Sequence, residues 1–425
     1  MSTIKYLYAR EILDGRGVPT VECSLWLDDG RSVTSSAPSG TSKSKYEAIE
    51  LRDSDPQRMN GLGVWRAVNN VNQVIAPQLL GQDPENQETI DQLMINLDGT
   101  HNKSNLGSNA ILAVSQAVLK AAALAHNLPL HQYIAQKFAF AGNSNIPTAI
   151  YTMIAGGTHG AANLDIQEFE IIPAGHHDFA TSLNIAVSVF QKLREVLILK
   201  GAIHSTGVSG GFTPNLFNNT DAFEILIETI KATNYTFAQD VFLGTDIAAA
   251  QFHEGGKYVL KDKSQAYSSQ DLIEYYKQLK ELYHVFYIED PFEEDDWKAW
   301  SALTAEIGGT SLIVGDSLLA SNLEKLNKAI AEKACNAILI KPNQNGSISE
   351  TLKVVKAAQE ANFQVIVSHR SGDTNDDFIA DFAVGVNANY MKFGPPHRGE
   401  RVAKYNRLLA IAQEIQYARQ SNKST

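Results

Sequence analysis

Short apolar segments recur along the chain beyond residue 145, and longer stretches of helical periodicity separate them. Examples are Val-Phe-Tyr-Ile at 285–288, Leu-Ile-Val-Gly at 312–315, Ala-Ile-Leu-Ile at 337–340 and Val-Ile-Val-Ser at 365–368. Apolar runs of this length between helical patterns are typical of buried parallel strands. The pattern predicts helices over 177–200, 219–233, 269–283, 294–306, 322–331, 347–361 and 375–384. Alternating strands and helices of this kind predict repeated βα units.

The first part of the chain has a different pattern. Residues 3–35 predict strands, because apolar residues alternate with polar ones from Val21 to Leu27 and a turn follows at Asp28-Asp29-Gly30. Helical patterns then follow at 64–79, 85–97, 107–126 and 129–137. The fold class is therefore α/β: a small α+β capping domain over 1–138, followed by a (β/α)8 barrel over 139–425. Residues 139–145 are interpreted as the linker, and the polar tail at 416–425 is expected to fray.

A polar residue stands at or just after the end of each apolar segment of the second part. Those residues are Glu289, Asp316, Lys341, His369 and Lys392, and the steps between them are 27, 25, 28 and 23 residues. One strand, one helix and their loops occupy about that length. In a barrel of βα units the C-terminal strand ends meet at one mouth, which is where such enzymes carry their chemistry.

Asp246 belongs to the same series of strand-end residues, and with Glu289 and Asp316 it gives three carboxylates. A single carboxylate at this position more often caps the next helix. Three carboxylates in register, with no His or Cys among them, favour binding of a hard divalent cation such as Mg²⁺ over helix capping.

The remaining strand ends carry basic and hydroxyl groups. Lys341 precedes Pro342, which keeps it out of the helical region, and a lysine facing a dication is suited to act as a base. The alternative is a structural ion pair. Lys392 lies in the same context, and His369-Arg370-Ser371 offers donors suited to phosphate. A loop carrying His159 and a strand start at Gln167-Glu168 add further candidate groups.

Composition narrows the classes of partner. With 44% hydrophobic residues, a net charge of −11 and a pI near 5.5, nucleic acid is not expected as the main partner. The two cysteines, Cys23 and Cys335, lie in apolar stretches and are interpreted as small buried hydrophobes. Neither a signal peptide nor a membrane-spanning stretch is recognised, so a soluble, cytoplasmic protein is expected.

Several separated motifs resemble those of the enolase (phosphopyruvate hydratase) family over nearly the whole chain. They are Ala9-Arg10…Leu13-Asp14-Gly15-Arg16-Gly17…Pro19-Thr20-Val21-Glu22, Tyr46-Glu47-Ala48…Glu50-Leu51-Arg52-Asp53, Leu97-Asp98-Gly99-Thr100…Asn109-Ala110-Ile111-Leu112, Ile288-Glu289-Asp290-Pro291-Phe292, Lys341…Asn343-Gln344…Gly346 and Val367-Ser368-His369-Arg370-Ser371-Gly372.

The resemblance implies a role for each candidate residue. Asp246, Glu289 and Asp316 would hold a first Mg²⁺ that binds the substrate carboxylate, and Ser42 would help to hold a second. Lys341 would remove the C2 proton; a lysine base with magnesium is the general arrangement of enolase-superfamily sites. Glu168 would be a further catalytic residue, and substrate contacts would come from His159, Gln167, His369, Arg370, Ser371 and Lys392.

The chain also departs from the family pattern. Ser209 stands in Gly207-Val208-Ser209-Gly210-Gly211, where enolases carry a Glu that protonates the departing hydroxide. A serine hydroxyl cannot replace that acid, and losing a general acid typically costs about 10²–10⁴ in rate. The segments at 39–44 and 155–162, which correspond to mobile loops of enolases, differ too, and Ser317 replaces the Asp that follows Asp316. Metal ligands and base are intact, whereas acid and lids have changed.

Three functions therefore remain open. The first is a magnesium-dependent lyase for 2-phosphoglycerate and phosphoenolpyruvate, as in glycolysis, with reduced activity and with Glu168 or a water as the proton donor. The second is an enzyme for another phospho- or phosphonocarboxylate, and the third is a non-catalytic binding protein. Enolases commonly dimerise. Arg10 and Glu22 occupy family interface positions, but their usual charged partners are Ala410 and Gln413 here, which indicates an altered homodimer.

Overall fold

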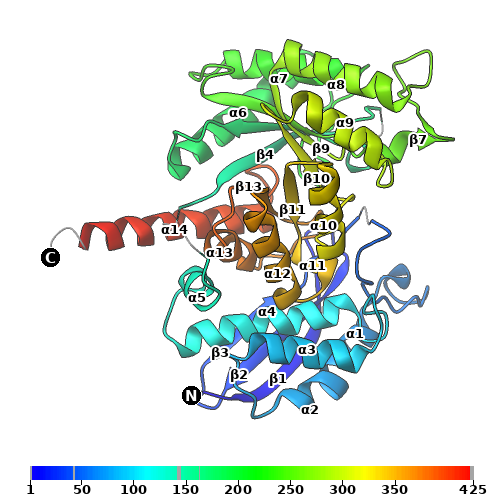
Figure 1. Ribbon diagram of the computed structural model, residues 1–425. Helices are drawn as coiled ribbons and strands as arrows, with labels where there is room; N and C mark the ends of the chain where they lie inside the picture. Colours follow the sequence, from blue (N-terminus) through cyan, green and yellow to red (C-terminus); the bar gives the residue numbers. More distant parts are fainter. Residues whose placement is uncertain (1, 42–43, 141–144, 162, 422–425) are drawn as a thin grey trace.

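The computed structural model describes residues 2–41, 44–140, 145–161 and 163–421. A small domain formed by the first part of the chain lies beside a barrel formed by the rest (Figure 1). The enolase-type architecture predicted from the sequence, a small α+β domain followed by a β/α barrel, is confirmed.

An antiparallel sheet forms one layer of the small domain. It consists of β1 (Ile4–Leu13), β2 (Pro19–Leu27) and β3 (Ser32–Ser36), in that order. The alternation seen in the sequence holds, because Val21, Cys23, Leu25 and Leu27 are all fully buried. The helices are α1 (Trp65–Asn69), η2 (Asn70–Ile75), α2 (Ala76–Leu79), α3 (Gln87–Asp98), α4 (Ser108–Ala125) and α5 (Leu130–Lys137).

Helix α4 packs against β2 and β3 and forms the centre of this domain. By length and composition it is apolar enough to cross a membrane, but most of it is buried against the sheet and the neighbouring helices. Its apolarity is therefore that of a core helix.

The single helix expected over 64–79 is divided in the structure. A π-helical turn, η2, separates α1 from α2. The Asn72 side chain in this turn accepts a hydrogen bond from the Ala9 backbone N–H at 2.7 Å and donates to the Ala9 carbonyl at 3.0 Å. Asn72 thus satisfies backbone groups on the edge of β1 that no strand pairs in the described part of the chain.

Eight strands close into the barrel in the order β10-β11-β12-β13-β4-β5-β6-β9. They are β4 (Thr148–Ala155), β5 (Glu168–Pro173), β6 (Val241–Asp246), β9 (Val285–Glu289), β10 (Leu312–Gly315), β11 (Ala337–Ile340), β12 (Gln364–Ser368) and β13 (Tyr390–Lys392). The remaining helices of this part are α6 (Phe179–Leu199), α7 (Asn219–Lys231), α8 (Ser269–Tyr283), α9 (Trp297–Ile307), α10 (Leu323–Glu332), α11 (Pro342–Asn345), α12 (Ile348–Glu360), α13 (Phe378–Gly385) and α14 (Gly399–Ser421). Short elements in the loops are η1 (Met59–Gly61), η3 (Gly157–His159), η4 (Ala249–Phe252), β7 (His253–Glu254) and β8 (Lys257–Tyr258).

Strand β5 breaks the simple βα repeat. It pairs antiparallel with both β4 and β6, and two helices, α6 and α7, follow it before the next barrel strand. The N-terminal end of β5 therefore lies at the mouth where the parallel strands end. This reversal places Glu168 opposite Asp246 in the strand register.

Most helix boundaries lie within two residues of the prediction, but α9 and α13 each begin three residues later than predicted. Helix α9 begins at Trp297 because the Asp296 side chain accepts a hydrogen bond from the backbone N–H of Ala299. Helix α13 begins at Phe378, whose backbone N–H donates to Asp376 Oδ1 at 2.9 Å, while Asp376 Oδ2 accepts from the Ser36 N–H of the small domain at 2.8 Å.

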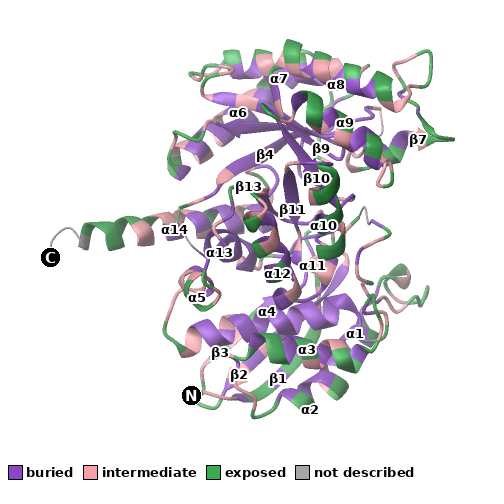
Figure 2. Ribbon diagram, viewed as in Figure 1, coloured by how far each residue is buried: buried purple, intermediate pink, exposed green. Residues whose placement is uncertain are grey.

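The expected fraying of the tail is wrong for 416–421, because α14 continues to Ser421; residues 422–425 lie outside the described part. In Figure 1 this helix projects from the body of the molecule, and in Figure 2 its outer half is largely exposed. These last turns are therefore held mainly by helical hydrogen bonds, and Arg419 adds a side-chain bond to Asn145 Oδ1 at 3.0 Å.

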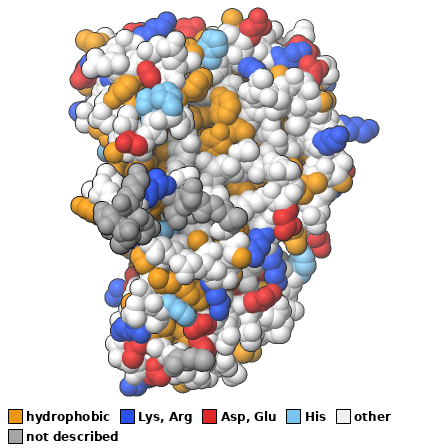
Figure 3. Space-filling model, turned by 60° about the vertical axis from the view of Figure 1, so that its left-hand side comes forward, with side chains coloured by type: hydrophobic (Ala, Val, Ile, Leu, Met, Phe, Trp, Pro, Cys, Tyr) orange, Lys and Arg blue, Asp and Glu red, His pale blue; other side chains and the backbone are white. Residues whose placement is uncertain are grey.

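Figure 2 shows that the strands of the barrel are almost entirely buried. Cys23 and Cys335 are free and buried, as expected. On the face shown in Figure 3, basic and acidic side chains are interspersed, and apolar side chains gather in the barrel half.

Candidate active site

A cavity of about 410 Å³ opens at the mouth of the barrel, where the parallel strands end. Nearly all the site residues expected from the sequence line it: His159, Gln167, Glu168, Ser209, Asp246, Asp316, Lys341, His369, Arg370, Ser371 and Lys392. Thr41 and Glu47 of the small domain complete the wall. Glu289 is fully buried behind this surface, and Ser42 lies outside the described residues.

The three predicted metal ligands come from three neighbouring strands. Asp246 is in register with Glu289, and Glu289 is in register with Val314, two residues before Asp316. The Gln167 amide donates a hydrogen bond to Asp246 Oδ2 at 2.8 Å. The parallel pairing of these strands therefore places the three carboxylates side by side.

Lys392 lies among four carboxylates. Its Nζ contacts Glu289 Oε2 and is 3.2 Å from Glu170 Oε1, 3.7 Å from Asp246 Oδ2 and 3.8 Å from Glu168 Oε2. Burial opposes the charged amine, but the surrounding carboxylates outweigh it and raise the pKa of Lys392 well above its usual value. One cation is too few to neutralise all four buried carboxylates in their ionised form.

The pKa values of the buried acids reflect this shortage of positive charge. Burial raises the pKa of Glu289 well above its ordinary value, and Asp246 adds to the effect; burial also raises the pKa of Asp246. Glu289 Oε1 is buried and has no hydrogen-bond partner within the described part of the chain. Carboxylates with an unsatisfied oxygen and a deficit of positive charge fit an oxygen-coordinated divalent cation.

Lys341 is fixed beside this group. Its Nζ contacts Asp316 Oδ2, and its backbone N–H donates to Ser321 Oγ at 3.0 Å. The Gln344 amide, one turn further on in α11, donates to Asp316 Oδ1 at 2.9 Å. Burial tends to raise the pKa of Asp316, but Lys341 reverses this and holds it below its ordinary value. The amine is thus directed toward the carboxylate cluster.

The segment after β12 faces the small domain. Burial and neighbouring cations hold the pKa of His369 well below its ordinary value, so its imidazole is neutral. Arg370 donates to both carboxylate oxygens of Glu47, at 3.1 and 3.0 Å. Ser371 Oγ accepts from the Thr41 N–H at 3.0 Å. The flank of the loop at 39–44 therefore rests against the predicted phosphate-binding residues.

Glu168 is paired rather than free. Its Oε1 lies 2.9 Å from His159 Nδ1, and its Oε2 accepts from Thr152 Oγ1 at 3.0 Å. Burial tends to raise its pKa, but the hydrogen bond from His159 and the charge of Lys392 reverse this and lower the pKa of Glu168. A carboxylate held ionised is a poor proton donor.

Ser209 stands in a loop that lies beside β4 and is buried at the cavity wall. Arg398 fixes this loop by donating to the carbonyls of Gly207 and Val208, at 3.0 and 3.2 Å. Among the described residues Ser209 Oγ has no hydrogen-bond partner. The side chain is in the predicted place but carries no acidic proton.

Some residues of the site were not identified as such from the sequence. Glu170 follows Glu168 by two positions, so the two-residue period of a strand indicates that both face the same side. Glu47 and Thr41 offered no comparable signal, because their contacts with Arg370 and Ser371 span more than 300 residues.

Fold and cavity together define a two-domain barrel protein with acidic strand ends and two lysines at the mouth. The chain belongs to the enolase family: residues 4–134 match the family model for the enolase N-terminal domain, and residues 143–423 match that for the enolase C-terminal TIM barrel domain. Its domains are those of an enolase-superfamily lyase, a family that generally uses Mg²⁺. The exact division at residues 138 and 139 stays a prediction.

Proposed function

We propose that this protein is a magnesium-dependent lyase that removes the C2 proton of 2-phosphoglycerate and forms phosphoenolpyruvate slowly. The observation that carries the proposal is the contact between the Lys341 amine and Asp316, inside a cavity whose wall holds Ser209 where the family has its acid. Base and metal ligands are present, but the proton donor is not.

Asp246, Glu289 and Asp316 would hold the first Mg²⁺, and Ser42 is proposed for a second. Bound magnesium supplies positive charge that neutralises the substrate carboxylate and makes the C2 proton more acidic. Lys392 would bind the same carboxylate, while Arg370 and Ser371 would bind the phosphate. His159, Gln167 and His369 would orient the substrate from the cavity wall.

The elimination has a simple balance of atoms. The Lys341 amine first takes the C2 proton, and the C–H electron pair moves into the substrate carboxylate. In a second step this electron pair forms the C2–C3 double bond, and the C3–O bond breaks. The leaving hydroxide must then gain a proton to depart as water. Neither the Ser209 hydroxyl nor the ionised Glu168 is a good source of that proton, so we assign it to a water. Turnover is therefore expected to be about 10²–10⁴ times slower than with a positioned acid.

The test compares two rates on the same enzyme. In deuterated buffer with saturating Mg²⁺, exchange of the C2 proton of 2-phosphoglycerate should outrun phosphoenolpyruvate formation measured by absorbance. Lys341→Ala should abolish exchange, whereas Lys333→Ala, an exposed lysine that follows α10, should leave it unchanged. If phosphoenolpyruvate formed rapidly and C2 exchange were no faster, the proposal that the site lacks a proton donor would be wrong. If no C2 exchange occurred at saturating Mg²⁺ and 2-phosphoglycerate, the third function, a non-catalytic binding protein, would be favoured.

Restoring the acid sharpens the test. Ser209→Glu should increase product formation relative to exchange, and Ser209→Ala should change neither. The gain is expected to be partial, because Val208 and the loops at 39–44 and 155–162 also depart from the family. An equal effect of the Glu and Ala variants would mean that this position does not limit the reaction.

A second candidate is an enzyme that acts on another phospho- or phosphonocarboxylate whose leaving group needs no proton. Ser209 Oγ has no hydrogen-bond partner among the described residues, and Glu168 is ionised. Both observations favour this candidate, because a group that leaves as a stable anion needs no general acid at either position. Rapid C2 exchange on 2-phosphoglycerate without phosphoenolpyruvate, together with full elimination from such an analogue, would select this candidate.

A homodimer with an altered interface is also proposed. Arg10 Nε bonds Glu22 Oε1 at 2.6 Å within the chain, so the charges at this family position already satisfy each other. Sedimentation over a range of concentrations should show a weak dimer; a concentration-independent dimer would contradict the altered interface. A cytoplasmic location stays a prediction.

A further inference from the structure

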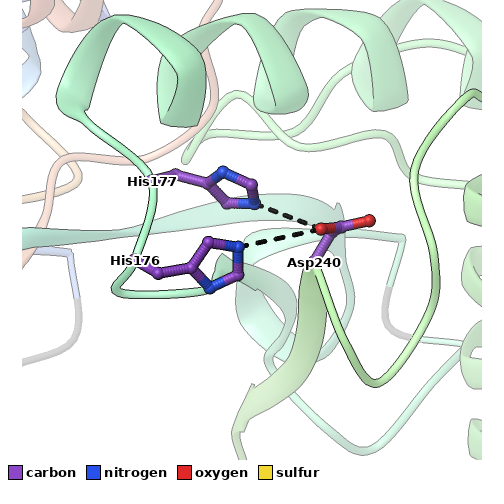
Figure 4. Close-up of side chains that lie close together, drawn as sticks. All are labelled: His176, His177 and Asp240. Atoms are coloured by element: carbon purple, nitrogen blue, oxygen red, sulfur yellow. Dashed lines mark ion pairs between the residues drawn. The ribbon is translucent and has the colours of Figure 1, made fainter.

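Two adjacent histidines and an aspartate meet at the end of the barrel opposite the cavity. His176 and His177 lie in the turn between β5 and α6, and Asp240 directly precedes β6. Figure 4 shows both imidazoles directed at the same carboxylate. The three ligand atoms lie within 4.8 Å of one another.

This cluster is separate from the cavity. Strands β5 and β6 pair from Glu168 with Asp246 at the mouth to Pro173 with Val241 at the other end. Five residue steps of about 3.4 Å separate the two ends by about 17 Å. The histidine cluster therefore cannot share an ion with the carboxylates of the mouth.

The distances suit a metal better than a hydrogen bond. Asp240 Oδ1 is 3.4 Å from His177 Nε2 and 3.9 Å from His176 Nε2. His177 Nε2 is buried and, in the described part of the chain, makes no hydrogen bond, although it faces this oxygen. Two ligand atoms bound to a tetrahedral Zn²⁺ at about 2.0–2.1 Å are about 3.3 Å apart. His176, whose side chain is 64% exposed, is free to close the remaining gap.

Asp240 and the backbone of the histidine turn are held in place before any ion binds. The Thr236 N–H donates to Asp240 Oδ2 at 2.8 Å, which leaves Oδ1 turned toward the imidazoles. Ala174 N–H donates to the Asp240 carbonyl at 2.8 Å, and His177 N–H donates to the Ala174 carbonyl at 3.1 Å. Asp178 then caps α6. Backbone bonds thus fix the turn against the start of β6.

We propose that His176, His177 and Asp240 bind a divalent first-row transition ion of the Zn²⁺ type, at a site independent of the enolase reaction. Two imidazoles and one carboxylate suit zinc, whereas Mg²⁺ prefers oxygen ligands and water. The exposure of His176 leaves room for a water as fourth ligand. Because the ion would join the turn after β5 to β6, binding should also stabilise the folded chain.

The experiment is a Zn²⁺ titration of the full chain by calorimetry in saturating Mg²⁺. Wild type should take up Zn²⁺ at one site, and His176→Ala and Asp240→Asn should each weaken that binding by at least about 100-fold, more than loss of an outer-sphere partner costs. His176 is largely exposed, and asparagine keeps an acceptor for Thr236, so both variants should fold. His204→Ala, an exposed histidine elsewhere, is the matched control and should bind as wild type does.

A second pair of variants identifies the end of the barrel that binds. Asp246→Asn should retain Zn²⁺ binding if the histidine cluster is the site. Loss in Asp246→Asn with retention in His176→Ala would overturn the proposal and assign zinc to the mouth. Equal binding in all variants would also overturn it. As an independent readout, Zn²⁺ should raise the unfolding temperature of wild type but not of Asp240→Asn.

Discussion

The two halves of the barrel interior differ sharply in chemistry. At the mouth, Lys392 lies among Glu168, Glu170, Asp246 and Glu289, all buried. In the other half, the interior is filled by a separate apolar cluster: Ile150, Ile172, Tyr287, Leu312, Val314, Ala337, Leu339 and Ile366. One half stabilises the fold, and the other holds charge that is costly to bury until ligands bind.

The change occurs within single strands. In β11, Ala337 and Leu339 belong to the apolar cluster, and Lys341 follows at the next inward position. In β9, Tyr287 belongs to the cluster and Glu289 follows two residues later. Inward-facing positions of a strand are two residues apart. The barrel interior therefore changes from apolar to charged between two successive inward positions of the same strand.

The largest effect is expected in the apolar half. Leu339→Ala removes a fully buried side chain and should lower the free energy of unfolding by about 2–5 kcal/mol. Urea unfolding measures this, and Leu282→Ala on the exposed side of α8 should change it by less than about 0.5 kcal/mol. If folded Leu339→Ala bound Mg²⁺ as wild type does, the apolar half would serve stability and the mouth ion binding, as inferred. An equal loss of stability and of Mg²⁺ affinity would contradict this division.

At the mouth, a substitution should affect Mg²⁺ affinity more than stability. Asp316→Ala removes a proposed ligand and should weaken Mg²⁺ binding by about 100-fold or more, with little loss of stability. Titration calorimetry provides the measurement, and Asp29→Ala, in an exposed turn, is the control. If Asp316→Ala bound Mg²⁺ as tightly as wild type, the assignment of this ligand would be wrong.

Between the halves lies Glu170. Burial raises its pKa to about 8 despite the opposing Lys392, with Glu168 and Asp246 adding to the effect. Below the unfolded-state pKa of about 4.5 both states are protonated, and above it only the folded state keeps the proton. The favourable contribution of this group is therefore present at low pH and is lost as pH rises through about 8.

Glu170→Gln should remove that pH dependence. Relative to wild type, the variant should gain about 1–3 kcal/mol in unfolding free energy between pH 5 and pH 8.5, measured without metal. Glu254→Gln in exposed β7 should show no such change. A variant that instead lost stability at the higher pH would show that Glu170 is stabilised as an anion by Lys392.

The smallest effect is expected at the rim far from the mouth. Asp178→Ala removes the side-chain bond to the Thr181 N–H, 2.8 Å long, at the start of α6, and should cost about 1 kcal/mol. Thermal unfolding in the absence of Zn²⁺ measures the change, and enolase-type proton exchange should be unaffected. A loss of exchange in Asp178→Ala would show that the two ends of the barrel are coupled.

Much of the fold followed from local patterns. Val21 to Leu27 alternated as the sheet requires, and Glu289, Asp316, Lys341 and Lys392 were placed at strand ends because apolar runs locate strands. The direction of β5 did not follow, since an apolar strand has the same composition whether it runs parallel or antiparallel. Its reversal was decided by pairing with β4 and β6.

By itself, the sequence determined the inward face of each strand and the acidic and basic groups at the mouth, and it predicted that Ser209 replaces the family acid. Only the tertiary structure decided which groups neutralise which: Glu47 binds Arg370, Lys392 is shared by four carboxylates, and His159 holds Glu168 ionised. It also brought His176 and His177 to Asp240 at the opposite rim. The physical reason is that periodicity depends on neighbours along the chain, whereas charge compensation depends on distances between residues that are remote in sequence.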